Sequence, residues 1–211
     1  VKSENIFRYN EYSNISSLDP VFSSTLRNIW PCNQIFNGLV RMDNNLNVVP
    51  DIAETWTISA DKKTYIFKIK NDIYFHESEY FENGQSRNVN AYDFEYSFNR
   101  LVDNDLASPG AWVMNNVESF GAINDSIFEI HLYNEFNSFL EILTMKYCSV
   151  VPKEVVQSLG NSFSKKPVGT GPFKFKRWDE NIKLVLVKNE NYHEFDQSGN
   201  RLPYLDAIST R

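Results

Sequence analysis

Residues 169–172 read Gly-Thr-Gly-Pro, and this stretch constrains the fold more than any other part of the chain. Two glycines and a proline within four residues do not suit the interior of a helix or of a central strand. Glycine adopts too many backbone conformations, and proline has no backbone N–H to donate. The stretch therefore predicts a turn. An alternating run with Phe173 and Phe175 follows it and predicts a strand, and residues 203–208 resemble the entry into another one.

The size and charge of the chain limit its class. With 211 residues, 42% hydrophobic and 15% aromatic, it can bury one sizeable core or two small ones. The formal net charge is −6 and the basic residues are scattered, which argues against a nucleic-acid partner, since phosphate contacts require clustered Lys and Arg. No apolar run approaches the roughly 20 residues of a membrane-spanning helix. No signal peptide precedes the first predicted strand, so we expect a mature or trimmed chain.

Local patterns predict alternating helices and strands. Asn90 is expected to cap a helix that runs to about Val102, with apolar residues on one stripe. Apolar residues at a spacing of three and four predict a helical segment over 22–40, which Pro31 interrupts. Further strands are expected at 6–9, within 56–73, and at 117–120, 127–132, 173–178 and 183–188; shorter helices are expected after Phe136 and from Pro152.

Cys32 and Cys148 are the two cysteines of the chain. A long-range disulfide between them is compatible with an oxidising compartment. Two separately buried thiols are the favoured interpretation, because free cysteine packs as a small hydrophobic residue.

The sequence offers no pattern for catalysis or for a metal. His76, His131 and His193 are far apart, and no serine or cysteine stands in a nucleophile-elbow context. His76 is expected to be structural, and His131 to face solvent or to be hydrogen-bonded within a strand. We therefore predict no catalytic residue, no metal site and no cofactor.

Two acidic segments carry carboxylates of the kind that form catalytic or calcium sites. Glu77, Glu79 and Glu82 can supply paired carboxylates for acid–base chemistry, but a solvated loop is favoured. Residues 103–105 begin like a calcium-binding loop, yet Ser108 occupies the sixth position, where glycine is needed. Neither segment predicts an ion or substrate site.

A series of short motifs runs through the chain in a fixed order. The motifs are Ser-Leu-Asp-Pro at 17–20, Ile-Phe-Asn-Gly-Leu at 35–39, Ala-Glu-Thr-Trp at 53–56, Asn-Ala-Tyr-Asp-Phe at 90–94, Ser-Phe-Asn-Arg at 97–100, Val-Pro-Lys at 151–153 and Pro-Tyr-Leu-Asp-Ala-Ile at 203–208. Together with the turn at 169–172, they resemble the family 5 extracellular solute-binding proteins, the peptide and nickel receptors of ABC importers. The resemblance extends over almost the whole chain and matches the N-terminal portion of the family only.

The resemblance implies a mixed α/β fold of the type II periplasmic-binding-protein kind, with mixed sheets and flanking helices. The chain would be the first lobe of a two-lobe, three-domain receptor. Residues 1–35 and 167–211 would form an incomplete, discontinuous subdomain near the hinge, and residues 36–166 an inserted smaller α/β subdomain. The second lobe would be absent, so we expect a truncated piece that binds ligand weakly. Gly169, Thr170, Gly171 and Pro172 would form the structural hinge turn.

The resemblance also points to two ligand-facing loops. One contains Phe22, Ser23, Ser24 and Thr25. The other, over 107–112, contains Ser108, Gly110 and Trp112, with Gly110 where the peptide receptors suggest an aromatic residue. Alternatives stay open: the 23–25 segment can cap the following helix, and Trp112 can belong to the core.

By resemblance, the function would be that of a non-enzymatic receptor. It would bind a dipeptide or oligopeptide in an interlobe cleft and deliver it to ABC permease subunits. It would work in the periplasm or outside the cytoplasmic membrane, peripheral to it, with a lipid anchor as a further expectation. A same-fold receptor for a nickel complex or an oligosaccharide is one alternative. A carbohydrate-active enzyme or a β-rich interaction module is another, of a different class.

Overall fold

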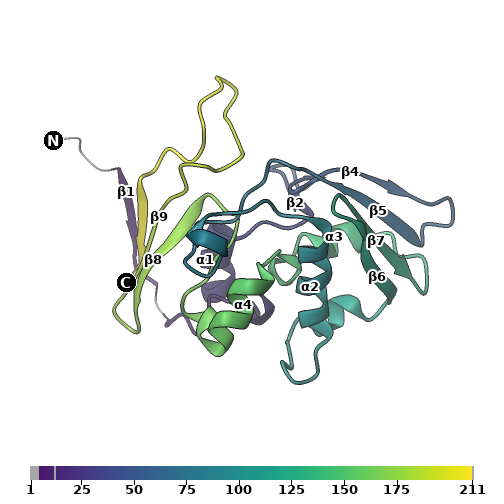
Figure 1. The fold of residues 1–211 in the computed structure, drawn as a ribbon, viewed down its shortest axis with the longest axis horizontal. Coiled ribbons are helices and arrows are strands. Elements are labelled where there is room, and N and C mark those ends of the chain that lie inside the picture. The colour runs from purple at the N-terminus through teal and green to yellow at the C-terminus, as the bar shows by residue number, and fades with distance from the viewer. Residues whose placement is uncertain (1–4, 12, 211) are drawn as a thin grey trace.

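The computed structural model describes residues 5–11 and 13–210, and it has two four-stranded sheets with helices between them (Figure 1). The strands are β1 (Ile6–Tyr9), β2 (Val40–Met42), β3 (Val48–Pro50), β4 (Ala53–Ile58), β5 (Thr64–Ile69), β6 (Val117–Asn124), β7 (Ile127–Leu132), β8 (Phe173–Asp179), β9 (Lys183–Lys188) and β10 (Ala207–Thr210). The α-helices are α1 (Leu26–Ile35), α2 (Ala91–Val102), α3 (Phe139–Leu143) and α4 (Lys153–Leu159). Short 3₁₀ turns are η1 (Pro20–Phe22), η2 (Glu82–Gly84), η3 (Ala111–Met114), η4 (Lys146–Cys148) and η5 (Gly160–Ser164). The expected mixed α/β class is confirmed.

We call the sheet of β1, β10, β9 and β8 the terminal sheet, because its strands come from the two ends of the chain. Its order is β1-β10-β9-β8, with β1 parallel to β10 and the other pairs antiparallel. Between β9 and β10 the chain makes the long excursion that projects from the molecule in Figure 1. Strand β10, the last of the described strands in the sequence, thus lies between β1 and β9 inside this sheet.

The second sheet, here the inserted sheet, has the order β4-β5-β7-β6 and is antiparallel throughout. Alternation in β5 and β7 buries one face of the sheet, as the period of two requires. Helix α2 packs against β6 and β7 through Phe94 and Phe98, and the ring of Phe128 lies 5.3 Å from that of Phe98 in an edge-to-face arrangement. An aromatic core therefore joins helix and sheet.

The start of α2 agrees with its prediction. The Asn90 side chain accepts from the backbone N–H of Asp93, and the Asp93 side chain accepts from the backbone N–H of Asn90. This reciprocal capping box satisfies two donors that a helix start leaves free.

The helical segment predicted over 22–40 is wrong at both ends. Helix α1 begins at Leu26 and ends at Ile35, and Pro31 lies inside it without interrupting it, contrary to the prediction. The backbone N–H of Gly171 donates to the Ile35 carbonyl at 2.8 Å, and that of Asn37 donates to Thr170 Oγ1 at 3.3 Å. Long-range partners therefore replace the next helical hydrogen bonds.

Two other expectations can be compared with the structure. Cys32 and Cys148 are both buried and free, which confirms the interpretation as separate thiols. The strand expected over 117–120 continues to Asn124 as β6.

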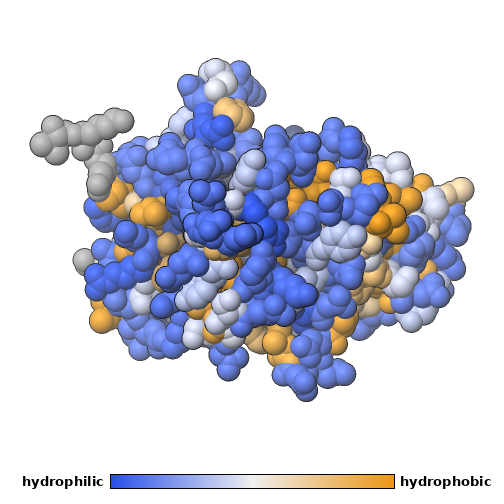
Figure 2. Space-filling view, in the orientation of Figure 1, coloured by the Kyte–Doolittle hydropathy of each residue, from blue (hydrophilic) through white to orange (hydrophobic). Residues whose placement is uncertain are grey.

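The surface seen in Figure 2 is mainly hydrophilic, with hydrophobic side chains gathered toward the end of the molecule that holds β4–β7. Among the described helices, none has both the length and the apolar character that crossing a membrane requires.

Candidate functional site

A buried ion pair ties the first predicted ligand loop to helix α2. Arg100 Nη2 and Nη1 donate to the two oxygens of Asp19 at 2.6 and 3.1 Å, and the side chains are only 9% and 5% exposed. Asp19 Oδ1 also accepts from the backbone N–H of Val21 at 3.2 Å and caps η1. Such a two-pronged contact fixes direction as well as distance. We call these residues, with Ser108, the charged junction.

Ser108 connects the second predicted ligand loop to the first. Its Oγ donates to the Val21 carbonyl at 2.6 Å and accepts from the backbone N–H of Gly110 at 3.0 Å. A Cβ on Gly110 would lie 2.3 Å from the ring of Tyr147, so an aromatic residue cannot occupy this position without displacing that ring. The charged junction thus holds residues 19–25 and 107–110 side by side.

An open hollow of about 510 Å³ lies over these two loops. It is lined by Ser16, Ser17, Phe22, Ser24, Thr25, Arg27, Asn28, Pro109, Asn161 and Ser164. Three of the predicted ligand residues, Phe22, Ser24 and Thr25, therefore share one cavity with the loop that carries Ser108.

The other predicted residues have different surroundings. Ser23 is buried and its Oγ donates to Cys32 Sγ at 3.1 Å. Ser108 and Gly110 are buried on either side of Pro109, which lines the hollow. Trp112 is 46% exposed, so it is not a core residue, and it lines a separate hollow of about 350 Å³ with Phe136. Thr25 occupies the cap position of α1 without a capping hydrogen bond from its side chain.

A second polar cluster surrounds the turn at 169–172. His76 Nε2 lies 2.9 Å from the Gly171 carbonyl, and the backbone N–H of Gly169 donates to His76 Nδ1 at 3.3 Å. Because a carbonyl only accepts, the proton is on Nε2 and the imidazole is neutral. Burial lowers the pKa of His76 to about 4, against a smaller opposing effect of the Gly171 carbonyl.

The glycines of this turn allow two chain segments to touch. A Cβ on Gly169 would lie 2.1 Å from the Ile35 carbonyl oxygen, and one on Gly171 would lie 2.5 Å from the Gln34 carbonyl oxygen. Beside them, Thr170 Oγ1 donates to Asn37 Oδ1 at 3.0 Å. Thr170 is fully buried, and the return segment packs directly on the end of α1. We call this cluster, with His76, the neutral junction.

Asp51 lies beside the neutral junction, on the side of the excursion after β9. Its carboxylate accepts from Asn37 Nδ2 at 3.0 Å and from the backbone N–H of Gly38 at 3.2 Å. Burial disfavours the charge on Asp51, but the neighbouring imidazole of His193 and the charge of Lys146 outweigh it and lower the pKa of this carboxyl. Asp51 is thus ionised in the interior.

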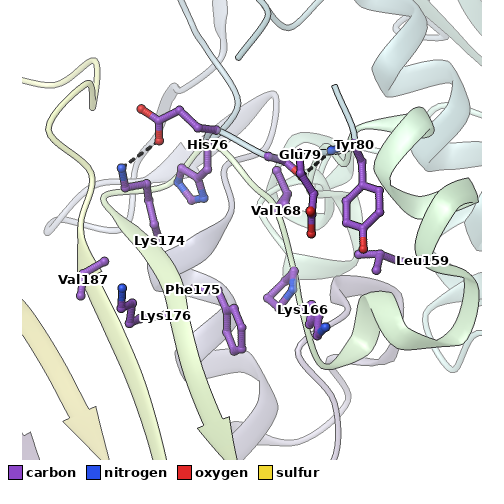
Figure 3. A pocket seen from close by; sticks show the side chains of 13 residues that line it. His76, Glu79, Tyr80, Leu159, Lys166, Val168, Lys174, Phe175, Lys176 and Val187 are labelled. Carbon is purple, nitrogen blue, oxygen red and sulfur yellow. Dashed lines mark hydrogen bonds and ion pairs between the residues drawn. The ribbon is translucent and has the colours of Figure 1, made fainter. Parts of the chain in front are cut away.

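A third hollow, of about 490 Å³, lies between β8 and the acidic loop. Figure 3 shows Lys174 and Lys176 on one side of it and Glu79 and Tyr80 on the other. Lys174 Nζ donates to Glu77 Oε2 at 2.8 Å, and this contact lowers the pKa of Glu77. A general acid needs a raised pKa, so Glu77 is unsuited to that role. Glu77, Glu79 and Glu82 are exposed, which confirms the solvated loop.

Sequence reasoning missed Arg100, Asn37 and Asp51. Each is a polar residue beside apolar residues that are buried: Arg100 precedes Leu101, Asn37 follows Phe36, and Asp51 precedes Ile52. A buried polar residue requires a partner, so this pattern was an available signal that these residues are paired inside the fold. The expectation for His131 is confirmed, since it is partly exposed and its Nδ1 lies 3.1 Å from Thr64 Oγ1.

The chain is similar in sequence to known solute-binding proteins. A family model described as bacterial extracellular solute-binding proteins, family 5 Middle, matches residues 47–211. A di/tripeptide-binding protein 1 of Pseudomonas aeruginosa is 26% identical over 180 residues, 77% of this chain and 33% of that protein. The dipeptide-binding protein DppE of Bacillus subtilis is 26% identical over 210 residues, 92% of this chain and 37% of that protein. The chain thus spans about a third of the length of the curated relatives it matches.

Solved structures show the same fold. The periplasmic binding protein DppA of Helicobacter pylori, in complex with the peptide STSA, superposes with a TM-score of 0.85 at 27% identity, covering 99% of this chain and 42% of that one. NikZ of Campylobacter jejuni, in complex with Ni(L-His), superposes with a TM-score of 0.80 at 23% identity, covering 99% of this chain and 38% of that one. At that lower identity the likeness concerns the fold alone.

Proposed function

The chain belongs to family 5 of the bacterial extracellular solute-binding proteins, and from this premise we propose that it supplies part of the peptide-binding surface of an ABC-importer receptor. The observation that carries the proposal is the hollow over residues 22–25 and 109, held in shape by the charged junction. Preformed, rigid walls lower the free-energy cost of ordering loops around a ligand.

The chemistry of the hollow suits a short peptide. Phe22 offers an apolar surface, Ser24, Thr25 and Asn28 offer hydroxyl and amide groups, and Arg27 offers a charge that pairs with a carboxylate. The named relatives are di- and tripeptide-binding proteins, which supports this class of ligand.

We further propose the expected domain plan, in which residues 1–35 and 167–211 belong near a hinge and residues 36–166 form an inserted subdomain. The distribution of strands supports it, because the terminal sheet draws on residues 6–9 and 173–210 and the inserted sheet on residues 53–132. The turn at 169–172 would be the return crossing. Ligand would then favour closure of a second lobe over the hollow by binding both surfaces.

The proposed setting is outside the cytoplasmic membrane, in the periplasm or at the cell surface with a lipid anchor, and the proposed partners are permease subunits. A nickel complex or an oligosaccharide is the second ligand class. NikZ, a structure of the same fold, was solved with Ni(L-His), so nickel–histidine is included among the test ligands.

The test is chemical-shift mapping of the ¹⁵N-labelled chain with a dipeptide, a tetrapeptide, nickel–histidine and an oligosaccharide. We expect weak peptide binding, with shifts concentrated at residues 22–25 and 107–112. Phe22→Ala should reduce the peptide-induced shifts, whereas Phe7→Ala, which truncates an exposed ring on β1, should not. Shifts confined to the hollow of Figure 3, or induced by nickel–histidine or sugar alone, would contradict the peptide proposal.

A further inference from the structure

Three potential metal ligands converge where the excursion after β9 meets the segment between β3 and β4. They are Asp51, His193 and Glu194, whose ligating atoms all lie within 4.8 Å of one another. The sequence predicted no metal site because Asp51 is far from His193 and Glu194 in the chain, so the three residues form no metal-ligand motif. The fold brings the adjacent residues His193 and Glu194 to Asp51, which is distant from them in the sequence.

His193 is the informative member of this group. Its side chain is only 9% exposed. The Nε2 atom is buried and has no hydrogen-bond partner in the structure. Its nearest acidic atom, Asp51 Oδ1, is 3.7 Å away. A buried polar atom without a partner is costly and therefore indicates a missing interaction.

The 3.7 Å separation is itself diagnostic. It is too long for a hydrogen bond, which spans about 2.7–3.2 Å between heavy atoms. Two ligands of a tetrahedral zinc ion, each about 2.0–2.1 Å from the metal, are roughly 3.3 Å apart. A small inward movement of His193 would therefore accommodate an ion between the imidazole and the carboxylate.

We propose that Asp51, His193 and Glu194 form a binding site for a divalent transition-metal ion, of which zinc fits the ligands best. Imidazole nitrogen favours zinc, nickel and copper over magnesium and calcium, and carboxylates complete a site with an open position for water. The inference does not depend on the proposed peptide function, because none of these residues lines the hollow over residues 22–25.

Two cationic side chains close to the proposed site oppose the binding of a metal ion. Arg41 Nη2 contacts Glu194 at 2.9 Å, but both side chains are partly exposed, and such pairs contribute little and rearrange easily. Lys146 acts on Asp51 from the interior and repels a second positive charge. Replacing Lys146 by methionine should therefore strengthen metal binding.

A bound ion would connect the two halves of the molecule. Asp51 lies just before β4 of the inserted sheet, and His193 lies between β9 and β10 of the terminal sheet. An ion that binds only the folded chain raises the melting temperature as its concentration rises.

The test is calorimetric titration of the chelator-treated, tag-free chain with zinc chloride, together with the visible absorption of the cobalt(II) form. We expect one ion per chain, with affinity reduced at least tenfold in His193→Gln and reduced in Glu194→Gln. His131→Gln and Glu190→Gln are the matched controls, because they alter a partly exposed histidine and an exposed glutamate elsewhere. Zinc should raise the melting temperature of the native chain and not that of His193→Gln.

Circular dichroism would first show that each variant is folded. If His193→Gln does not fold, the contrast between Glu194→Gln and Glu190→Gln decides, since Glu194 lies at the accessible rim. Equal zinc affinity in the native chain and in both site variants would overturn the proposal. So would the loss of binding in His131→Gln alone, or no uptake of zinc by the native chain.

Discussion

The charged junction and the neutral junction perform similar tasks with different chemistry. Each connects the segment around α1 to a distant part of the chain: the first through the Asp19–Arg100 ion pair, the second through His76 and the closely packed glycines at 169 and 171. The first depends on opposite charges that compensate one another in the interior. The second depends on shape and on an imidazole that stays neutral. The two should therefore fail under different perturbations.

The largest effect is expected from removing one charge of the charged junction. Arg100→Met leaves the Asp19 carboxylate buried and unpaired, and we expect a loss of about 3–5 kcal/mol in the free energy of unfolding. Urea unfolding followed by circular dichroism measures it. Arg177→Met, which breaks an exposed pair with Asp179, is the control and should change stability negligibly.

The double variant Asp19→Asn, Arg100→Met sharpens this result. It removes both charges, so it should be more stable than Arg100→Met alone if the unpaired charge is the cause. Equal stability of the single and double variants would show that packing, including the contact of Arg100 over the Phe163 ring, accounts for the loss instead.

The next largest loss of stability is expected from a steric change at the neutral junction. Gly169→Ala places a methyl group against the Ile35 backbone oxygen, and we expect a loss of about 3 kcal/mol because backbone must move. Gly121→Ala is the control, since its nearest neighbour is a side-chain oxygen of Glu95 at 3.6 Å. If both substitutions cost the same in thermal unfolding, close packing is not what the glycine provides.

A dependence on acid is expected at the neutral junction, and it is absent near neutral pH. Folded His76 has a pKa of about 4, below the ordinary 6.5, so the unfolded chain binds its proton first. Stability is unaffected above about pH 6.5, falls as the pH drops toward 4 by about 3 kcal/mol in total, and then levels off. Protonation of His76 Nδ1 would also break the hydrogen bond that this atom accepts from the Gly169 backbone N–H.

The measurement is the difference in unfolding free energy between the native chain and His76→Gln across this pH range. Carboxylates titrate in both proteins, so their contribution to the pH dependence is removed when the difference is taken. The charges that face His76 are Lys174, which lowers its pKa, and Glu77, which raises it. A difference that does not vary with pH would contradict the neutral-imidazole assignment.

Local elements could be predicted from the sequence because their causes are local. The capping box of Asn90 and Asp93 and the hairpin that joins β4 to β5 lie within a few residues of one another. The end of α1 could not be predicted, since hydrogen bonds from Gly171 and Asn37 determine it and the former is distant in sequence. The same holds for the site: loops 22–25 and 107–112 were predicted, whereas the Asp19–Arg100 pair that positions them spans 81 residues.

The place of β10 in the terminal sheet has a consequence for the order of events during synthesis. Strand β1, made before the other described strands, has β10 as its only partner within the described chain, and residues 207–210 are made nearly two hundred residues later. The inserted sheet, by contrast, is complete once residue 132 has emerged. A nascent chain would therefore form the inserted sheet early and carry β1 unpaired until β10 is made, because contacts distant in sequence form last.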